Sequence, residues 1–277
     1  VQFLENYMYN LDPKKAISIV FATPRFDAAA AGAGARAAAN LAIALRGEKA
    51  AESLYILPTE ANVNGMRDMG VDPERGAGRT ALDKPGMTFQ QMVDAAIDGK
   101  LKAMIIVGDN PLMFAPDRAR VERALASLDA LIVIDSLLTD TAKLAHAVLA
   151  DVPAYGKTGT FTNAERRVNR LHAALDALGD ARPALLALTD LANAIVRTGD
   201  ASSTAGRWSY AHPDSVTDEV AQNVAGYERF TSAYSFWGKA RIFDLPSRFD
   251  AQAVAHATTP VRSDGSLLLT TGRTLFT

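Results

Sequence analysis

Short apolar runs alternate with helix-forming segments along the first half of the chain. The runs are rich in Val, Ile and Leu and predict strands at residues 16–22, 54–57, 103–107 and 130–135. The segments between them predict helices at residues 27–45, 87–97 and 116–128. Wholly apolar strands separated by helices are typical of parallel strands that are covered on both faces. The pattern therefore predicts an α/β fold with a doubly wound, Rossmann-like and mostly parallel sheet, which binds ligands at the carboxyl ends of its strands.

The pattern changes beyond Pro153. Helices are expected at residues 182–198 and 214–225, and a further buried strand at residues 266–272. Aromatic residues between Trp208 and Trp237 stand among polar ones, which indicates long segments lying on a surface. These aromatics either face a partner or anchor the segment on its own core.

Composition narrows the class of protein. The chain has 277 residues, is 48% hydrophobic and 22% charged, and carries a net charge of −2, as a folded globular protein does. The absence of a basic excess argues against nucleic-acid binding. Because there is no cysteine, this stretch holds no disulfide, thiolate nucleophile or iron–sulfur cluster of its own. No apolar run approaches the roughly 20 residues of a membrane helix.

Several short motifs match a known site only in part. The Gly-Ala-Gly-Ala-Arg-Ala run at residues 32–37 lies too far beyond its strand for a dinucleotide turn, so a helix start packed closely on the sheet is preferred. Gly156-Lys-Thr158 lacks the first glycine of a phosphate loop, since Asp151 stands there. The histidines at 146, 172, 212 and 256 have no metal-ligand spacing, and no serine has the flanking glycines of a nucleophile elbow.

Two loops carry chemistry that a ligand could use. The Gly108-Asp-Asn-Pro111 turn directly follows a predicted strand, and Asp135 ends the next one. They form either a nucleotide site or an ordinary strand-to-helix turn with a capping Asn-Pro. The segment 159–168 combines a glycine, two hydroxyls, an amide and a Glu-Arg-Arg cluster. It could hold an anion, although a structural loop in which Glu165 pairs with an arginine is preferred.

Four segments, taken in order, resemble the molybdopterin oxidoreductase superfamily; they are residues 62–70, 105–111, 131–168 and 268–273. The resemblance implies two Rossmann-like domains around a bis-molybdopterin guanine dinucleotide, closed by a carboxy-terminal β-rich domain. On this basis residues 1–60 are the tail of one Rossmann-like lobe. Residues 61–258 are a second Rossmann-like domain with an irregular, aromatic-rich end, and residues 259–277 begin the β-rich domain. Both ends would then be internal to a longer protein.

The resemblance also implies positions for a bound cofactor. It places Gly108, Asn110 and Pro111 at the nucleotide phosphates and ribose, and Asp135 and Thr139 at the guanosine. Asn64, Gly65 and Asp68 would lie near the pterin, and the cofactor-binding set is completed by Gly159, Thr160 and Asn163. No catalytic residue or metal ligand is expected in this chain, because in the family the residue that binds molybdenum lies upstream.

Three acids of the family pattern are replaced here, by His146, Gly156 and Thr158. Carboxylates are good acceptors for the N–H groups of guanine, so their loss suggests a site without bound cofactor. This favours one branch, the large iron–sulfur subunit of respiratory NADH:quinone oxidoreductase (complex I). The protein would then be a structural platform for other peripheral-arm subunits. It would be inactive alone and have its iron–sulfur clusters upstream. It would lie on the cytoplasmic face of the membrane without entering it.

Two alternatives remain open. The first is a middle fragment of a molybdenum or tungsten bis-molybdopterin guanine dinucleotide oxidoreductase, of the formate dehydrogenase or nitrate reductase type. The second is a stand-alone nucleotide-binding module, which depends only on residues 108–111 and Asp135.

Overall fold

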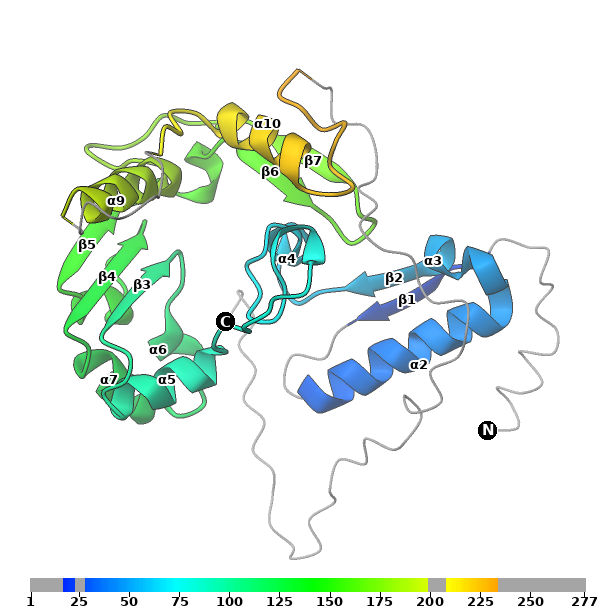
Figure 1. The fold of residues 1–277 in the computed structure, drawn as a ribbon, viewed down its shortest axis with the longest axis horizontal. Helices are drawn as coiled ribbons and strands as arrows, with labels where there is room; N and C mark the ends of the chain where they lie inside the picture. The colour runs from blue at the N-terminus through cyan, green and yellow to red at the C-terminus, as the bar shows by residue number, and fades with distance from the viewer. Residues whose placement is uncertain (1–16, 23–27, 199–207, 234–277) are drawn as a thin grey trace, which may run out of the picture. The chain divides into compact units, whose positions relative to one another are not determined.

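The computed structural model describes residues 17–22, 28–198 and 208–233 (Figure 1). They divide into two compact units, which are described separately. Within the described residues, the first unit comprises 17–22, 28–64 and 162–167, and the second comprises 65–161, 168–198 and 208–233. The predicted strand at 266–272, the start of a β-rich domain at 259–277 and the aromatics from Tyr234 to Trp237 lie outside the described residues.

The first unit contains a strand–helix–strand motif. Strand β1 (Ile19–Ala22) pairs in parallel with β2 (Leu54–Leu57), and helix α2 (Ala28–Arg46) with the short η1 (Gly47–Lys49) and α3 (Ala50–Ser53) connects them. Its core is formed by Ala42, Ile43 and Ala50, packed against Ile19 and Leu54. These strands and the long helix lie where the hydrophobic pattern predicts them.

The glycine-containing run at residues 32–37 lies inside α2, where Gly34 packs against β1. A Cβ atom added at Gly34 would lie 2.5 Å from Cζ of Phe21 in β1, whereas one added at Gly32 would meet no atom within 4 Å. The glycine thus lets the helix approach the aromatic ring closely. This confirms the close-packing interpretation of residues 32–37 over a dinucleotide turn.

The second unit contains a three-stranded parallel sheet in the order β3 (Ala103–Val107), β4 (Ala130–Asp135) and β5 (Ala147–Ala150). Ile105 pairs with Ile132, and Ile132 with Ala147. The sequence pattern predicts β3 and β4 but not β5, whose four residues are too short a run to stand out. All three carboxyl ends meet at one edge of the sheet.

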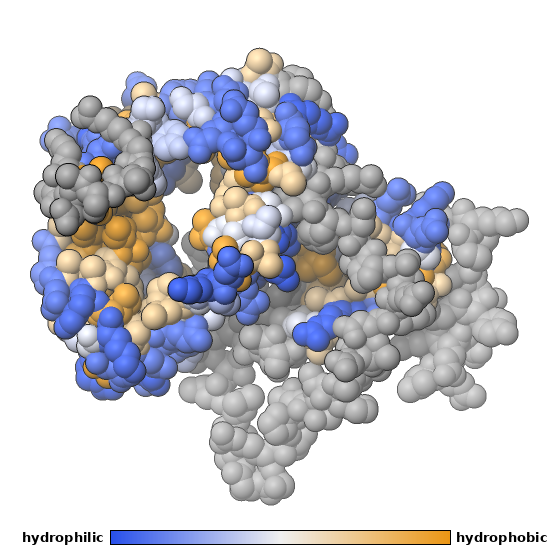
Figure 2. Space-filling model, in the orientation of Figure 1, coloured by the Kyte–Doolittle hydropathy of each residue, from blue (hydrophilic) through white to orange (hydrophobic). Residues whose placement is uncertain are grey.

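Helices cover both faces of this sheet, as the doubly wound prediction requires. On one face α5 (Phe89–Ile97), α6 (Pro111–Phe114) and α7 (Arg118–Ala126) pack on Ile106, Leu131 and Val133. The alternation of a strand turns Ile134 to the other face, where it is fully buried and where α9 (Ala184–Thr198) contacts β4. Part of that face stays open, since Ile105 and Val107 are 44% and 42% exposed. Figure 2 shows hydrophobic residues gathered over this sheet.

Apart from α10 (Pro213–Asn223), the remaining elements are short. The short ones are α4 (Val63–Asp68), η2 (Ala77–Arg79), α8 (Asp140–Lys143), η3 (Ala154–Gly156) and the hairpin of β6 (Gly159–Thr162) and β7 (Val168–Leu171). The helix expected at 116–128 begins two residues later, because the side chain of Asp117 accepts from the backbone N–H of Arg120 and caps α7. Within the described part of the chain, no helix is both long and apolar enough to cross a membrane.

The packing of Gly34 on Phe21 predicts opposite effects for two otherwise similar substitutions. Gly32→Ala should stabilise the protein by about 1 kcal/mol, because alanine is the better helix former and the added methyl meets no atom. Gly34→Ala should destabilise it by about 1–2 kcal/mol, because the Phe21 ring must move. Thermal unfolding of the purified protein measures both, and equal melting temperatures would contradict the packing described.

Candidate functional site

Two loops meet at the carboxyl edge of the β3–β4–β5 sheet. Gly108 follows β3 with a φ of 63° and donates its N–H to the carbonyl of Ile134 at 2.8 Å. Asp135 ends β4, and Thr139 caps α8 by accepting from the N–H of Ala142 at 3.1 Å. Adjacent parallel strands bring their following loops together. The structure therefore gathers the predicted residues of the two loops, which are Gly108, Asn110, Pro111, Asp135 and Thr139.

Hydrogen bonds between Asn110 and Thr141 join the two loops. The Thr141 hydroxyl donates to Oδ1 of Asn110 at 2.6 Å, and the Thr141 N–H points to the same oxygen at 3.4 Å. The hydroxyl oxygen of Thr141 in turn accepts from the N–H of Leu112 at 3.3 Å. Because the amide oxygen of Asn110 is held inside, its NH₂ group is directed away from Thr141 as a donor.

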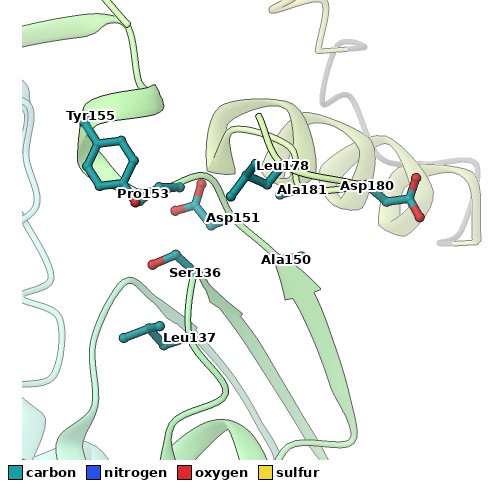
Figure 3. Close-up of a pocket in the computed structure, with 9 residues that line it drawn as sticks. All are labelled: Ser136, Leu137, Ala150, Asp151, Pro153, Tyr155, Leu178, Asp180 and Ala181. Carbon is teal, nitrogen blue, oxygen red and sulfur yellow. The ribbon is translucent and has the colours of Figure 1, made fainter. Parts of the chain in front are cut away.

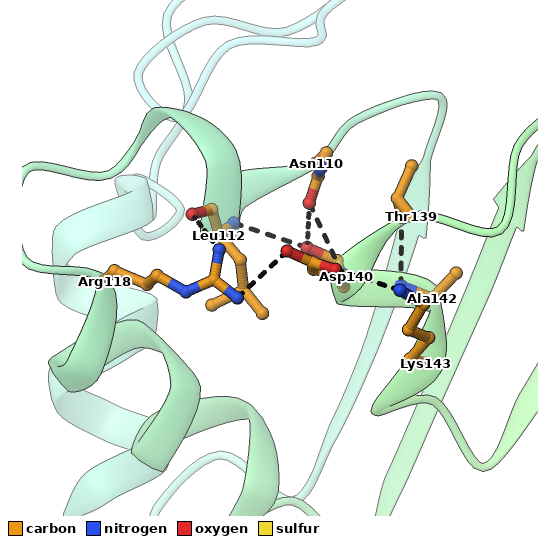
Figure 4. Close-up of polar contacts among 8 residues, drawn as sticks. Asn110, Leu112, Arg118, Thr139, Asp140, Ala142 and Lys143 are labelled. Carbon is orange, nitrogen blue, oxygen red and sulfur yellow. Dashed lines mark hydrogen bonds and ion pairs between the residues drawn. The ribbon is translucent and has the colours of Figure 1, made fainter.

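Arg118 makes a second link between the same loops. Its guanidinium donates to the carbonyl of Leu112 at 3.3 Å and to Asp140 at 3.0 Å (Figure 4). The Arg118 hydrogen bond, followed by the Lys143 hydrogen bond, holds the pKa of Asp140 below its usual value. Asp140 is thus ionised at neutral pH, and the link between α7 and α8 is an ion pair.

Three backbone N–H groups of the segment 108–112 are already bonded within the protein. The N–H of Gly108 bonds to Ile134, that of Asn110 to Asp109 at 2.8 Å and that of Leu112 to Thr141, while Pro111 has none. The Asp109 side chain is exposed, and those of Asn110 and of Asp135, at the end of β4, are partly exposed. Each carboxylate also accepts a backbone N–H of its own loop, Asp109 from Asn110 at 2.8 Å and Asp135 from Leu137 at 3.1 Å. A donor beside carboxylate acceptors suits hydroxyls, such as those of a ribose, better than a phosphate.

A pocket of about 470 Å³ lies at the ends of β4 and β5 (Figure 3). Its walls come from the loop after β4, the segment after β5 and the turn before α9; the lining residues are Ser136, Leu137, Ala150, Asp151, Pro153, Tyr155, Leu178, Asp180 and Ala181. Asp151 is only 4% exposed and belongs to the wall. It pairs with Lys157 and accepts from the N–H of Ala184 at 2.9 Å, at the start of α9. Figure 3 shows the Asp180 carboxylate directed away from the other lining side chains.

Two other predicted residues meet in the first unit. The side-chain amide of Asn64 donates to the carbonyl of Asn163 at 3.1 Å, and Oδ1 of the neighbouring Asn62 accepts from Thr162 at 2.9 Å. These bonds join residues 62–64, at the start of α4, to residues 162–163, at the end of β6. Glu165 pairs with Arg167 two residues away, as a structural loop would.

Asp68, predicted to lie near a pterin, is turned inward in the second unit. Its carboxylate is completely buried and accepts from Nε of Arg79 at 2.7 Å and from the hydroxyl of Tyr227 at 2.8 Å. Gly65 is buried one turn earlier in α4, and Gly159 and Thr160 lie in β6. The hydrogen bonds at the carboxyl edge described above involve none of these four residues.

His146 lies at the opposite edge of the sheet from the two loops. It directly precedes β5, where its Nδ1 accepts from the N–H of Leu131 at 2.9 Å and its own N–H donates to the carbonyl of Leu131 at 2.8 Å. His146 therefore lies at the amino end of β5, away from the loops that follow β3 and β4. Thr158 accepts from the N–H of Ala173 at 3.2 Å.

Comparison with known proteins decides the family. The family model described as molybdopterin oxidoreductase matches residues 9–194, which is most of the chain. The chain belongs to the molybdopterin oxidoreductase family. Over 208 residues it is 36% identical to a Bacillus subtilis protein named "Putative formate dehydrogenase YrhE", and it covers 20% of that protein and 66% of its own length. Proteins of Staphylococcus aureus with the same type of name are 32% identical over 186 residues, with 61% of this chain and 18% of theirs covered.

The chain thus spans about a fifth of the length of these curated relatives. The relatives carry formate dehydrogenase names and not the name of a complex I subunit. Acetylene hydratase from Pelobacter acetylenicus, a solved structure, superposes with a TM-score of 0.37 at 21% identity, over 48% of this chain and 19% of that one. The family assignment comes from the sequence match and not from this superposition.

Sequence reasoning missed three residues that organise this edge, namely Thr141, Arg118 and Asp151. Thr141 lies two residues beyond the Thr139 that the family pattern marks, and only the pairing of β3 with β4 shows that it reaches Asn110. In the sequence, Asp151 is notable only because it stands where a phosphate loop would have its first glycine. Among the residues that the structure describes, no three His, Asp or Glu side chains gather as metal ligands.

The buried position of Asp68 predicts a large effect of a small substitution. Asp68→Asn should destabilise the protein by about 3 kcal/mol, because it removes the negative charge that pairs with Arg79 inside the unit. Asp98→Asn is the matched control, because Asp98 pairs with Lys100 on the surface and should change the melting temperature little. If both variants melt like the wild type, Asp68 is not the buried anchor described.

Proposed function

We propose that this chain is part of a molybdenum or tungsten oxidoreductase of the formate dehydrogenase type. Its second unit would bind the guanosine end of a molybdopterin guanine dinucleotide at the carboxyl edge of the β3–β4–β5 sheet. The family match and the names of the relatives support this proposal. The observation that carries it is the hydrogen bond from Thr141 that fixes the amide oxygen of Asn110 in the loop after β3, while the loop after β4 leads from Asp135 to the pocket residues Ser136 and Leu137.

The residues at this edge fit such a nucleotide. Asn110 would donate to a ribose hydroxyl, and the carboxylates of Asp109 and Asp135 would accept from the hydroxyls, as acids at strand ends do in other dinucleotide sites. The pocket would take the base, since Leu137, Leu178 and Tyr155 give it mostly apolar walls and Ser136 adds a hydroxyl. When bound, the cofactor would supply a redox-active metal centre. The residues of this chain would bind and orient its nucleotide end.

The complex I interpretation is less well supported than this one. It depends on three lost acids, and His146 lies at the edge of the sheet away from the proposed nucleotide site. The relatives' names also favour the enzyme. Contacts with further electron-transfer subunits, and iron–sulfur clusters elsewhere in the polypeptide, belong to the proposal in either case.

Metal and cofactor content test the proposed function. The protein purified from its own source should contain molybdenum or tungsten, and acid hydrolysis should release guanosine monophosphate together with a fluorescent oxidised pterin. Elemental mass spectrometry and chromatography measure both. A folded protein that carries its iron–sulfur clusters but has neither metal nor pterin would contradict the proposal and favour a cofactor-free platform.

Asn110→Ala should weaken binding of guanosine monophosphate to the cofactor-free protein by about tenfold, because it removes one oriented hydrogen bond of about 1–2 kcal/mol. Calorimetric titration measures the affinity. Asn193→Ala is the control. Asn193 lies on α9 and forms two hydrogen bonds with the backbone of Trp208, and the loss of these bonds should not change the nucleotide affinity. Equal affinities of the wild type and Asn110→Ala would show that Asn110 does not bind the nucleotide.

A further inference from the structure

We infer that Thr141 is a positioning residue of the nucleotide site, and that its hydroxyl sets which end of the Asn110 amide a ligand meets. The inference rests on the proposed function. Thr141 is itself 0% exposed, so it acts through Asn110 and touches no ligand.

The direction of the hydrogen-bond chain follows from the donors available. The backbone N–H of Leu112 can only donate, so the Thr141 oxygen accepts there, at 3.3 Å. The single hydroxyl hydrogen of Thr141 is then left for Asn110, at 2.6 Å. A backbone N–H, that of Thr141, approaches the same Asn110 atom at 3.4 Å. Because a backbone N–H can only donate, this Asn110 atom is the amide oxygen, and the Thr141 hydroxyl donates to the same oxygen.

An amide that is rotated by half a turn would bring its NH₂ group against both donors. That arrangement loses the bond from the Thr141 N–H and brings two N–H donors together. The Thr141 oxygen would then have to accept from the NH₂ group, which would take the Asn110 acceptor away from its buried hydroxyl hydrogen. The Asn110 donors are therefore held toward the ligand side before any nucleotide binds. Without the Thr141 hydroxyl, only the longer bond from the Thr141 N–H, at 3.4 Å, favours this orientation, and the amide presents its oxygen to the ligand for more of the time.

The loops themselves do not depend on this hydroxyl. Arg118 joins the same two loops through the carbonyl of Leu112 and the carboxylate of Asp140, at 3.3 and 3.0 Å. Loss of the Thr141 hydroxyl should thus leave the loops together and free the Asn110 amide. This separates a positioning role from a general structural one.

The test is calorimetric titration of guanosine monophosphate into cofactor-free protein. Thr141→Val, which keeps the shape and removes the hydroxyl, should weaken binding by about fivefold to tenfold. Thr141→Ser, which restores the hydroxyl, should bind within about twofold of wild type. Thr189→Val is the matched control, because Thr189 is also buried and donates to the carbonyl of Leu185, on α9, and it should leave the affinity unchanged. If Thr141→Val does not fold, Thr141→Ala takes its place against Thr141→Ser.

Two results would overturn the inference about Thr141 and leave the proposed nucleotide site standing. The first is wild-type affinity in Thr141→Val while Asn110→Ala binds weakly. The second is a Thr141→Ser variant as weak as Thr141→Val, which would assign the effect to packing of the methyl group. If the wild-type protein does not bind guanosine monophosphate, the proposed nucleotide site fails and the inference fails with it. Metal and pterin found in the natively purified protein would then still support the enzyme.

Discussion

The parallel pairing of β3 with β4 is the constraint on which the candidate site depends. It aligns Val107 with Ile134, so the chain leaves both strands at the same edge and the two following loops meet. The apolar side chains of Ile106, Leu131 and Val133 hold the pair against α5 and α7. Burial of this core stabilises the pairing, and the pairing brings Asn110 to Thr141, a residue 31 positions later in the sequence.

Buried polar groups then determine how each loop is directed. Asn110 is ordered by Thr141, the start of α9 by Asp151, and the end of α4 by the contact of Asp68 with Tyr227. Each of these groups has a hydrogen-bond partner, as burial requires. Hydrogen bonds to these side chains therefore have two different effects. At Asp68 they keep the carboxylate from contacting a ligand, whereas at Asn110 they hold the amide oxygen and leave the NH₂ group available to one.

Much of this arrangement could be predicted from the sequence. The apolar runs predict β1 to β4 because they contain almost no polar residues, and the segments between them predict the long helices. Gly108, Asn110 and Asp135 could be placed at a strand end for the same reason. The short β5 and the contacts of Thr141, Arg118 and Asp151 could not, since they depend on which loops the sheet brings together. The position of His146 at the amino end of β5 could not be predicted either, because the sequence pattern does not reveal this short strand.

The central claim is that the loops after β3 and β4 are the nucleotide-binding edge of this family member. Hydrogen–deuterium exchange of the cofactor-free protein, with and without guanosine monophosphate, tests it most directly. The account predicts slower exchange at residues 108–114 and 136–143, and in the segment 151–156 that lines the pocket. Slower exchange confined to other segments, such as the Asn62–Asn64 region, or no change on adding the nucleotide, would contradict it.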